Sequence, residues 1–185
     1  LERIYGTILG ETQGGFDQSI ASIGTTIAKA SIAVYNSLAR ELLPTPTKSH
    51  YLFNTRDLAK VIQGVTRATK QFYDSKESIL QLWIHENLRV FGDRLWDVND
   101  STWLRRQIDT NMRLHFGVSW NEVLSTGATT SVASEVDEKL NECHPFVSFM
   151  RQGLDVPPYE AAVDASALKE FLTEKLEDYG LEAGN

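Results

Sequence analysis

The chain has 185 residues, of which 42% are apolar, so it is long enough for one medium domain with a real hydrophobic core. Its 25 acidic and 18 basic residues give a net charge of -7, which argues against a protein that binds nucleic acid by neutralising phosphates. All apolar runs are far shorter than the roughly 20 residues of a membrane-spanning helix. The single cysteine, Cys143, excludes an internal disulfide and a cysteine-based zinc cluster, and favours a reducing compartment such as the cytoplasm.

The first half of the chain predicts helices separated by glycine and proline. A short apolar helix face at residues 4–9 is followed by a glycine pair, and a long helix is then expected from residue 16 to 42, ended by Pro44 and Pro46. Residues 50–53 are aromatic and extended in character. Asn54 or Thr55 then supplies a plausible N-cap for a helix that reaches Val65.

The second half continues this pattern. Ser75 or Ser78 caps a helix that is expected to run to Leu95. Acidic and amide side chains at residues 97–100 then cap a further helix, and Gly117 is expected to stop it. Small and hydroxylated residues predict a loop over 126–134, and a last helix is expected over 165–179. Because no stretch alternates with period two, we predict a mainly α helical bundle of five or six principal helices.

The residues that could support catalysis or metal binding do not form a recognisable motif. The four histidines lie far apart, and Arg89 stands where a zinc-binding helix that contains His85 and Glu86 would need its second histidine. No strained turn surrounds Ser131 or Ser134, and no phosphate-binding loop of the Walker type is present. We therefore assign no catalytic residue and no metal ligand, and expect that the fragment alone is not an enzyme.

Two groups of polar side chains leave alternatives open. Arginines at positions 89, 94, 105, 106 and 113 lie among tryptophans and phenylalanines, but nearby acidic residues favour a salt-bridged surface over a nucleic-acid interface. Arg56 is expected in the first turn of its helix, where backbone N–H groups favour anions. It could face a phosphate, or it could pair with Asp57 or solvent, and the spacing alone favours the second alternative.

Two sequence runs carry a family resemblance. Residues 43–62 resemble a segment of axonemal dynein heavy chains; their sequence is LPTPTKSHYLFNTRDLAKVI. Residues 82–95 are similar to a second segment of the family, which follows the first at a comparable separation; their sequence is LWIHENLRVFGDRL. Residues 1–42 resemble the family's IYGTIL helix and the long helix after it, and the C-terminal part resembles the stretch that leads into the fourth AAA+ unit. The resemblance is weakest between residues 125 and 141. Thr47 and Thr55 stand where Ala and Leu are usual in the family.

The resemblance implies the small helical lid of the third AAA+ unit. It divides the chain into the end of a large domain with a long helix (1–42), the lid bundle (43–125), and a variable loop with a helical linker (126–185). It also implies that Arg56 is the sensor-2 arginine, which contacts a phosphate of ATP. ATP or ADP would be held mainly by a large domain that precedes residue 1, and the fragment alone would need no cofactor.

The implied function is coupling of nucleotide state between neighbouring units of an ATP-driven microtubule motor of cilia and flagella. The expected partners are the large domain of the same unit, the next AAA+ unit and, through the parent motor, microtubules; no nucleic acid or membrane is expected. The implied location is the cytoplasm, the cytoskeleton and the axoneme. An alternative function is a docking surface for an axonemal regulatory partner, centred on the variable loop at 126–134.

Overall fold

The structure is a computed structural model that describes residues 18–69, 72–125, 142–151, 153 and 157–183. It divides into two compact units, residues 1–143 and 144–185. The described secondary-structure elements of the first unit are all helices, joined by turns and irregular segments, and the described part of the second unit contains one helix and one pair of short strands. The prediction of a mainly α fold is therefore confirmed. The expected helix face at residues 4–9 and the loop at 126–134 lie outside the described residues.

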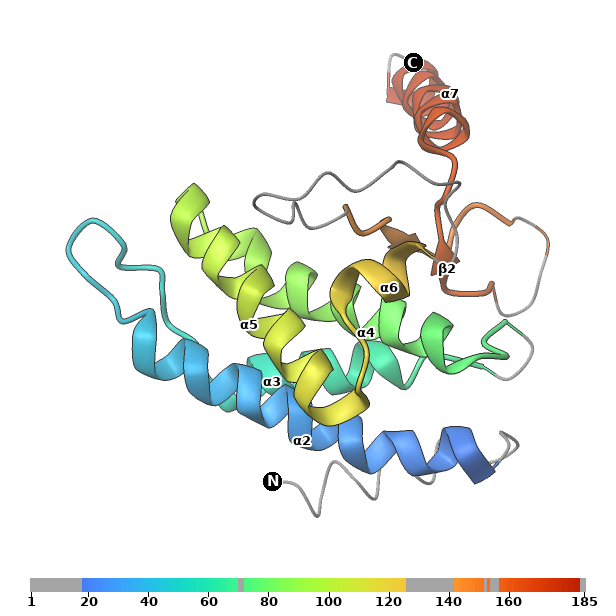
Figure 1. Cartoon of the computed structure of the whole chain (residues 1–185). Coiled ribbons are helices and arrows are strands. Elements are labelled where there is room, and N and C mark those ends of the chain that lie inside the picture. Colours follow the sequence, from blue (N-terminus) through green and yellow to red (C-terminus); the bar gives the residue numbers. More distant parts are fainter. Residues whose placement is uncertain (1–17, 70–71, 126–141, 152, 154–156, 184–185) are drawn as a thin grey trace, which may run out of the picture. The chain divides into compact units, whose positions relative to one another are not determined.

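The first unit is a bundle of α2 (Gln18–Glu41), α3 (Thr55–Val65), α4 (Lys76–Val90), α5 (Val98–Phe116) and the short α6 (Trp120–Ser125) (Figure 1). The expected long helix is α2, and its side chains at 23, 27, 30, 34 and 38 are all buried, as its periodicity predicts. The contacts of α4 include α2, α3, α5 and α6, so this helix forms the centre of the bundle. Trp83 of α4 is fully buried, and its indole Nε1–H donates to Ser31 Oγ on α2 over 2.8 Å.

The capping residues expected from the sequence bound three of these helices. Asn54, Ser75 and Asp97 accept hydrogen bonds from backbone N–H groups of the first turns of α3, α4 and α5. Gly117 ends α5 with a left-handed φ of 71°, which glycine adopts without steric cost. These predictions of helix ends are confirmed. They could be made from the sequence because a cap depends only on residues that are close in sequence.

One helix end differs from its prediction. We expected a helix as far as Leu95, but α4 ends at Val90 and the 3-10 turn η1 (Gly92–Arg94) follows it. Phe91 and Leu95 remain buried on either side of this turn, so the apolar pattern continues after the α-helix has ended. Periodicity alone cannot locate such an end, and the turn carries Arg94, which is important for the site described below.

The second unit is built around the strands β1 (Phe146–Val147) and β2 (Glu160–Ala161), which pair antiparallel with Phe146 opposite Ala161. Arg151 binds Glu160 through two hydrogen bonds of 2.7 and 2.8 Å. The helix α7 (Ala165–Ala183) follows β2, and Phe171 on it stacks on Phe149 at a centroid distance of 5.6 Å. The last expected helix is thus confirmed, and it extends four residues beyond its predicted end, Tyr179.

Candidate functional site

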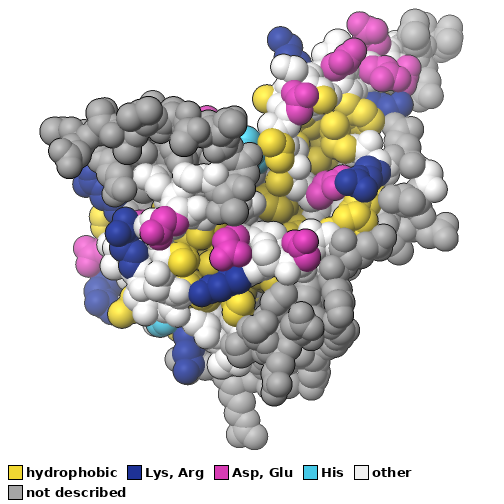
Figure 2. Space-filling view, turned by 45° about the vertical axis from the view of Figure 1, so that its right-hand side comes forward, with side chains coloured by type: hydrophobic (Ala, Val, Ile, Leu, Met, Phe, Trp, Pro, Cys, Tyr) yellow, Lys and Arg dark blue, Asp and Glu magenta, His cyan; other side chains and the backbone are white. Residues whose placement is uncertain are grey.

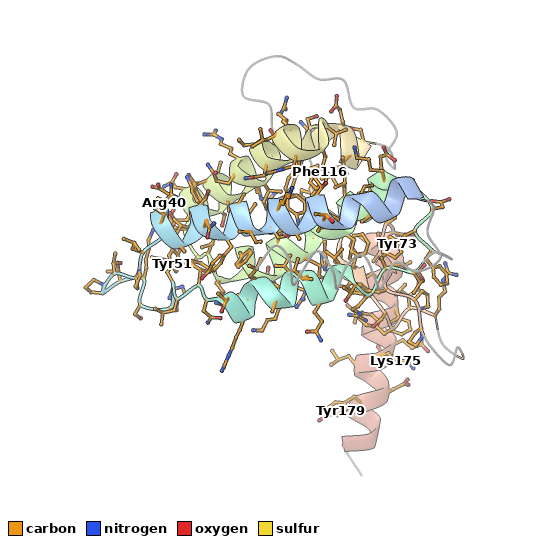
Figure 3. All side chains as sticks on the ribbon, turned by 90° about the horizontal axis from the view of Figure 1, so that it is seen from below. Arg40, Tyr51, Tyr73, Phe116, Lys175 and Tyr179 are labelled. Carbon is orange, nitrogen blue, oxygen red and sulfur yellow. The ribbon has the colours of Figure 1, made fainter. Side chains whose placement is uncertain are left out.

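The candidate site is the corner of the bundle where α3 begins. Figure 3 shows Tyr51 at the same end of the bundle as Arg40, which lies near the end of α2, and Tyr73 at the opposite end. The chain enters α3 through residues 51–53, which belong to no helix or strand, and Asn54 caps the helix. His50, which we expected in an extended segment, lies in a turn, and the backbone N–H of Leu52 donates to its carbonyl oxygen. Arg56 is therefore the second residue of α3, and its side chain is exposed.

At the start of α3, the cap occupies two backbone N–H groups, whereas the guanidinium of Arg56 stays open to a ligand. The backbone N–H groups of Arg56 and Asp57 donate to Asn54 Oδ1 over 2.8 and 3.2 Å. Our expectation that open N–H groups in this turn favour an anion is therefore wrong for these two amides, because the cap occupies them. In the part of the chain that the structure describes, no hydrogen bond or ion pair holds the Arg56 side chain.

Asp57, which we considered as a partner for Arg56, binds another arginine. Its carboxylate lies 2.6 and 3.0 Å from the two terminal nitrogens of Arg94, and Lys60 approaches to 3.5 Å. One carboxylate oxygen also accepts from the backbone N–H of Asn54, which completes a capping box. Burial alone would raise the pKa of Asp57, but the Arg94 and Asn54 hydrogen bonds and the Arg94 charge hold this pKa below its ordinary value.

Arg94 joins the two sequence runs in space. Besides Asp57, it donates to the backbone carbonyl of Leu52 over 3.2 Å, and its guanidinium lies 6.0 Å from the ring centre of Phe53. His50 Nε2 lies at hydrogen-bond distance, 3.1 Å, from the carbonyl oxygen of Arg94. The segment before α3 is thus attached to η1 at several points.

A second polar cluster extends this attachment to the start of α5. Lys48 Nζ lies 3.1 Å from Asp97 and 2.5 Å from Asp100, and the Tyr51 hydroxyl donates to Asp100 over 2.8 Å. Hydrogen bonding to Asp100 contributes to raising the pKa of Lys48. Both clusters connect residues about 40 to 50 positions apart in sequence, so the patterns formed by nearby residues do not predict them.

The other arginines agree in part with the expected salt-bridged surface. Arg89 binds the buried carboxylate of Glu86, and Arg113 binds Asp109. Arg94 departs from the expectation, since its partner is Asp57 rather than an acidic residue close by in sequence. On the face shown in Figure 2, Lys and Arg side chains stand among Asp and Glu side chains without a continuous basic surface.

The remaining candidate residues that the structure describes show no catalytic arrangement. Burial raises the pKa of the Cys143 thiol to about 12, so this group is protonated at neutral pH and a poor nucleophile. Ser131 and Ser134 lie outside the described residues. Among the residues that the structure does describe, no group of three histidine, cysteine or acidic side chains could hold a metal ion.

No described helix combines the length and the apolar character needed to cross a membrane.

The first unit is a helical bundle in which α3 begins with an exposed arginine, in agreement with the helical lid that the family resemblance implies. The family model for the ATPase lid domain of dynein heavy chains matches residues 8–101. Over all 185 residues the chain is 50% identical to the Dynein-1-beta heavy chain of the flagellar inner arm I1 complex of Chlamydomonas reinhardtii. The chain belongs to the dynein heavy chain family, and the part matched by the model is its ATPase lid domain.

Mammalian relatives agree with this assignment. The chain is 48% identical to Dynein axonemal heavy chain 2 of Homo sapiens over 99 residues, which are 54% of the chain and 2% of that protein. It is 34% identical to the same heavy chain of Mus musculus over 180 residues, which are 97% of the chain. The chain spans only 4% of the length of the Chlamydomonas and mouse proteins.

Proposed function

We propose that this chain is the lid of the third AAA+ unit of an axonemal dynein heavy chain, and that Arg56 senses the nucleotide bound in that unit. The lid would contact the large domain of its own unit and the next unit along the chain. The parent protein would be an ATP-driven microtubule motor of cilia and flagella. The order of the two sequence runs, and the likeness of the C-terminal part to the stretch that precedes the fourth unit, support the choice of unit.

The observation that carries the proposal is the unpaired state of Arg56 beside a fully engaged Asp57. The nearest acidic side chain in the sequence is Asp57, whose carboxylate is occupied by Arg94, Lys60 and the cap. The guanidinium of Arg56 therefore keeps its donors for a partner outside the described residues. Its planar array of N–H groups suits the oxygens of a phosphate, so the residues present fit ATP.

The contacts around Arg56 also suggest how the lid responds to the nucleotide. Bound ATP would supply the negative charge of its γ-phosphate, and Arg56 would bind that charge. Because the neighbouring Asp57 is attached to Arg94 of η1, a force on the start of α3 is transmitted to the connection between α4 and α5. The lid would then move as one body and not through bending of a single loop.

The test is Arg56→Ala in the intact motor. A charge-assisted hydrogen bond contributes about 1.5–3 kcal/mol, so the affinity of this unit for ATP should fall about 10- to 100-fold. ADP lacks the γ-phosphate, and its affinity should fall less than about threefold. Equilibrium binding of both nucleotides and the ATP dependence of microtubule gliding would measure the effect. Unchanged ATP affinity and unchanged gliding would refute the proposed role.

Two further measurements separate this role from a structural one. Arg67 is an exposed arginine just beyond the other end of α3, and Arg67→Ala is the matched control, expected to leave the ATP to ADP ratio unchanged. Arg56→Ala itself should change the free energy of unfolding of the lid by less than about 0.5 kcal/mol, since no described contact is lost. A large loss of stability would instead indicate that Arg56 supports the fold.

A further inference from the structure

A cationic groove lies between the second half of α3 and the last turn of α4, apart from the candidate site. It has a volume of about 570 Å³, and its lining residues are Lys60, Gln63, Gly64, Thr66, Arg67 and Arg89. Three of them are basic and none is acidic, although acidic residues outnumber basic ones by 25 to 18 in the chain. We call the hollow lined by these six residues the α3–α4 groove.

The α3–α4 groove lies against the buried carboxylate of Glu86. A methyl group at Gly64 would overlap this carboxyl group, so the backbone of α3 packs closely on it. Glu86 Oε2 accepts hydrogen bonds from two nitrogens of Arg89, over 3.1 and 2.5 Å. The Arg89 side chain is nevertheless 46% exposed. Glu86 therefore holds Arg89 in position at the groove and offsets one of the three positive charges that line it.

The other two basic residues follow one side of α3 and of the turn after it. Lys60, Gln63 and Arg67 are spaced by three and four residues, which is the spacing of neighbours on one helix face. The backbone N–H of Arg67 donates to the carbonyl oxygen of Gly64 over 3.1 Å, and this bond continues the turn beyond the end of α3. At the α-helical rise, the row from Lys60 to Arg67 is about 10 Å long.

Lys60 contributes positive charge to the groove because it is held weakly. Its Nζ lies 3.5 Å from Asp57, beyond the ordinary range of a hydrogen bond, and its side chain is 56% exposed. The Asp57 carboxylate is already bound to Arg94. Like charges gathered around one hollow repel each other, and an anionic partner removes this cost.

We infer that the α3–α4 groove binds an acidic polypeptide segment with carboxylates at several positions along it. Every second side chain of an extended segment is about 6–7 Å from the last, so two such carboxylates fit a row about 10 Å long. An arginine can bind a carboxylate through two parallel hydrogen bonds, and arginine clusters recognise acidic motifs. A single phosphate would leave part of the row without a partner, and the net charge of -7 disfavours nucleic acid.

The first experiment measures binding of a fluorescently labelled hexaglutamate peptide to the 185-residue protein by anisotropy, at low ionic strength. Lys60→Gln/Arg67→Gln should raise the Kd at least about fivefold, because two charge contacts are lost. Lys29→Gln/Arg106→Gln is the matched control, since it removes two exposed charges from α2 and α5 with the same change in net charge. It should change the Kd less than about twofold. Equal Kd values in the two double variants, or equally tight binding of hexaglutamine, would overturn the inference.

The second experiment uses the unsubstituted protein, so it does not depend on the folding of a variant. A carbodiimide joins a peptide carboxylate to a lysine amine as an amide and takes up the lost water to become a urea. Mass spectrometry should find hexaglutamate on Lys60 in at least about fivefold higher yield than on Lys29, which is also exposed. High salt should abolish this preference. A yield on Lys60 no higher than on Lys29 would contradict the inference.

Competitors distinguish the acidic segment from other anions. Inorganic phosphate should displace labelled hexaglutamate no better than chloride of the same ionic strength. Specific displacement by phosphate would show that a single anion occupies the groove, and tighter binding of a single-stranded oligonucleotide of equal charge would assign it to nucleic acid; either result would refute the inference. Arg56 is not among the lining residues, so the inference does not depend on its proposed role.

Discussion

At the scale of single residues, Asp57 determines how the start of α3 is held. Its carboxylate is almost fully buried and is compensated by Arg94, Lys60 and the backbone of Asn54. A buried carboxylate without such partners is costly, because the charge loses its hydration. The same arrangement leaves Arg56 free to bind elsewhere, so the stability of the corner and its proposed function depend on one set of contacts.

We predict that Arg94→Ala destabilises the lid by about 2–3 kcal/mol, less than the roughly 3–5 kcal/mol of a fully buried pair, because the Arg94 side chain is 32% exposed. The loss has two parts, since Asp57 is left buried without its main cation and Leu52 loses its hydrogen bond. Urea unfolding of the 185-residue protein at pH 7 would measure the change. Arg106→Ala, at an exposed position of α5, is the control and should change the free energy of unfolding by less than about 0.5 kcal/mol.

The effect of Arg94→Ala should depend on pH in a definite direction. The pKa of Asp57 is lowered in the folded protein, so its contribution to stability is fully present above the unfolded value, about 4, and is lost as pH falls through the folded value. The difference between the parent protein and Arg94→Ala should therefore shrink below about pH 4. If unfolding curves at pH 7 and pH 3 gave the same difference, Asp57 would not be the group that Arg94 stabilises.

At the scale of secondary-structure elements, Gly64 allows α3 and α4 to approach closely. By itself, a glycine inside a helix weakens that helix, by up to about 1 kcal/mol relative to alanine. In the structure, a methyl group at Gly64 would overlap the carboxyl group of Glu86 on α4. Glu86 is fully buried and bound to Arg89, so it has little room to move. Close packing of the helices thus outweighs helix propensity at this position.

We predict that Gly64→Ala lowers the free energy of unfolding by about 1–3 kcal/mol, despite the better helix propensity of alanine. Gly180→Ala is the matched control, because Gly180 also lies within a helix but has open space where the methyl group would be. That substitution should leave stability unchanged or raise it by up to about 1 kcal/mol. Thermal or urea unfolding of both variants would measure the contrast, and a neutral Gly64→Ala would show that Glu86 can move aside.

What the sequence could predict at this scale depended on the distance between interacting residues. The N-caps of α3, α4 and α5 and the stop at Gly117 follow from residues within one helical turn. The attachment of Arg94 to Asp57 joins residues 37 positions apart, and no local pattern indicates it. The helix α6 has only six residues, too few for its periodicity to be recognised, and the two-residue strands β1 and β2 are shorter still. Arg56 was identified through the family resemblance, and the proposed partner of its guanidinium stays a prediction.

At the scale of the whole molecule, the two units differ in how their helices are stabilised. α4 contributes five of the largest fully buried side chains of the described residues: Ile79, Leu80, Leu82, Trp83 and Ile84. α7 has apolar side chains in solvent, with Leu172, Leu176 and Tyr179 exposed by 48%, 71% and 70%. Most helical stability in proteins comes from packing, so α4 should open only when the first unit unfolds, whereas α7 should open locally.

Hydrogen exchange of the 185-residue protein would test this difference, with peptides from α4 compared with peptides from α7. We predict that α7 amides exchange at least about 100-fold faster than α4 amides, because opening α7 exposes little apolar surface that is not already exposed. Gly64→Ala should accelerate exchange in α4 and leave α7 unchanged, since each unit has its own contacts. Protection of α7 equal to that of α4 would contradict the prediction, because it would require packing that the described contacts of α7 do not supply. In the intact motor, any additional protection of α7 would measure what the rest of the heavy chain contributes to this helix.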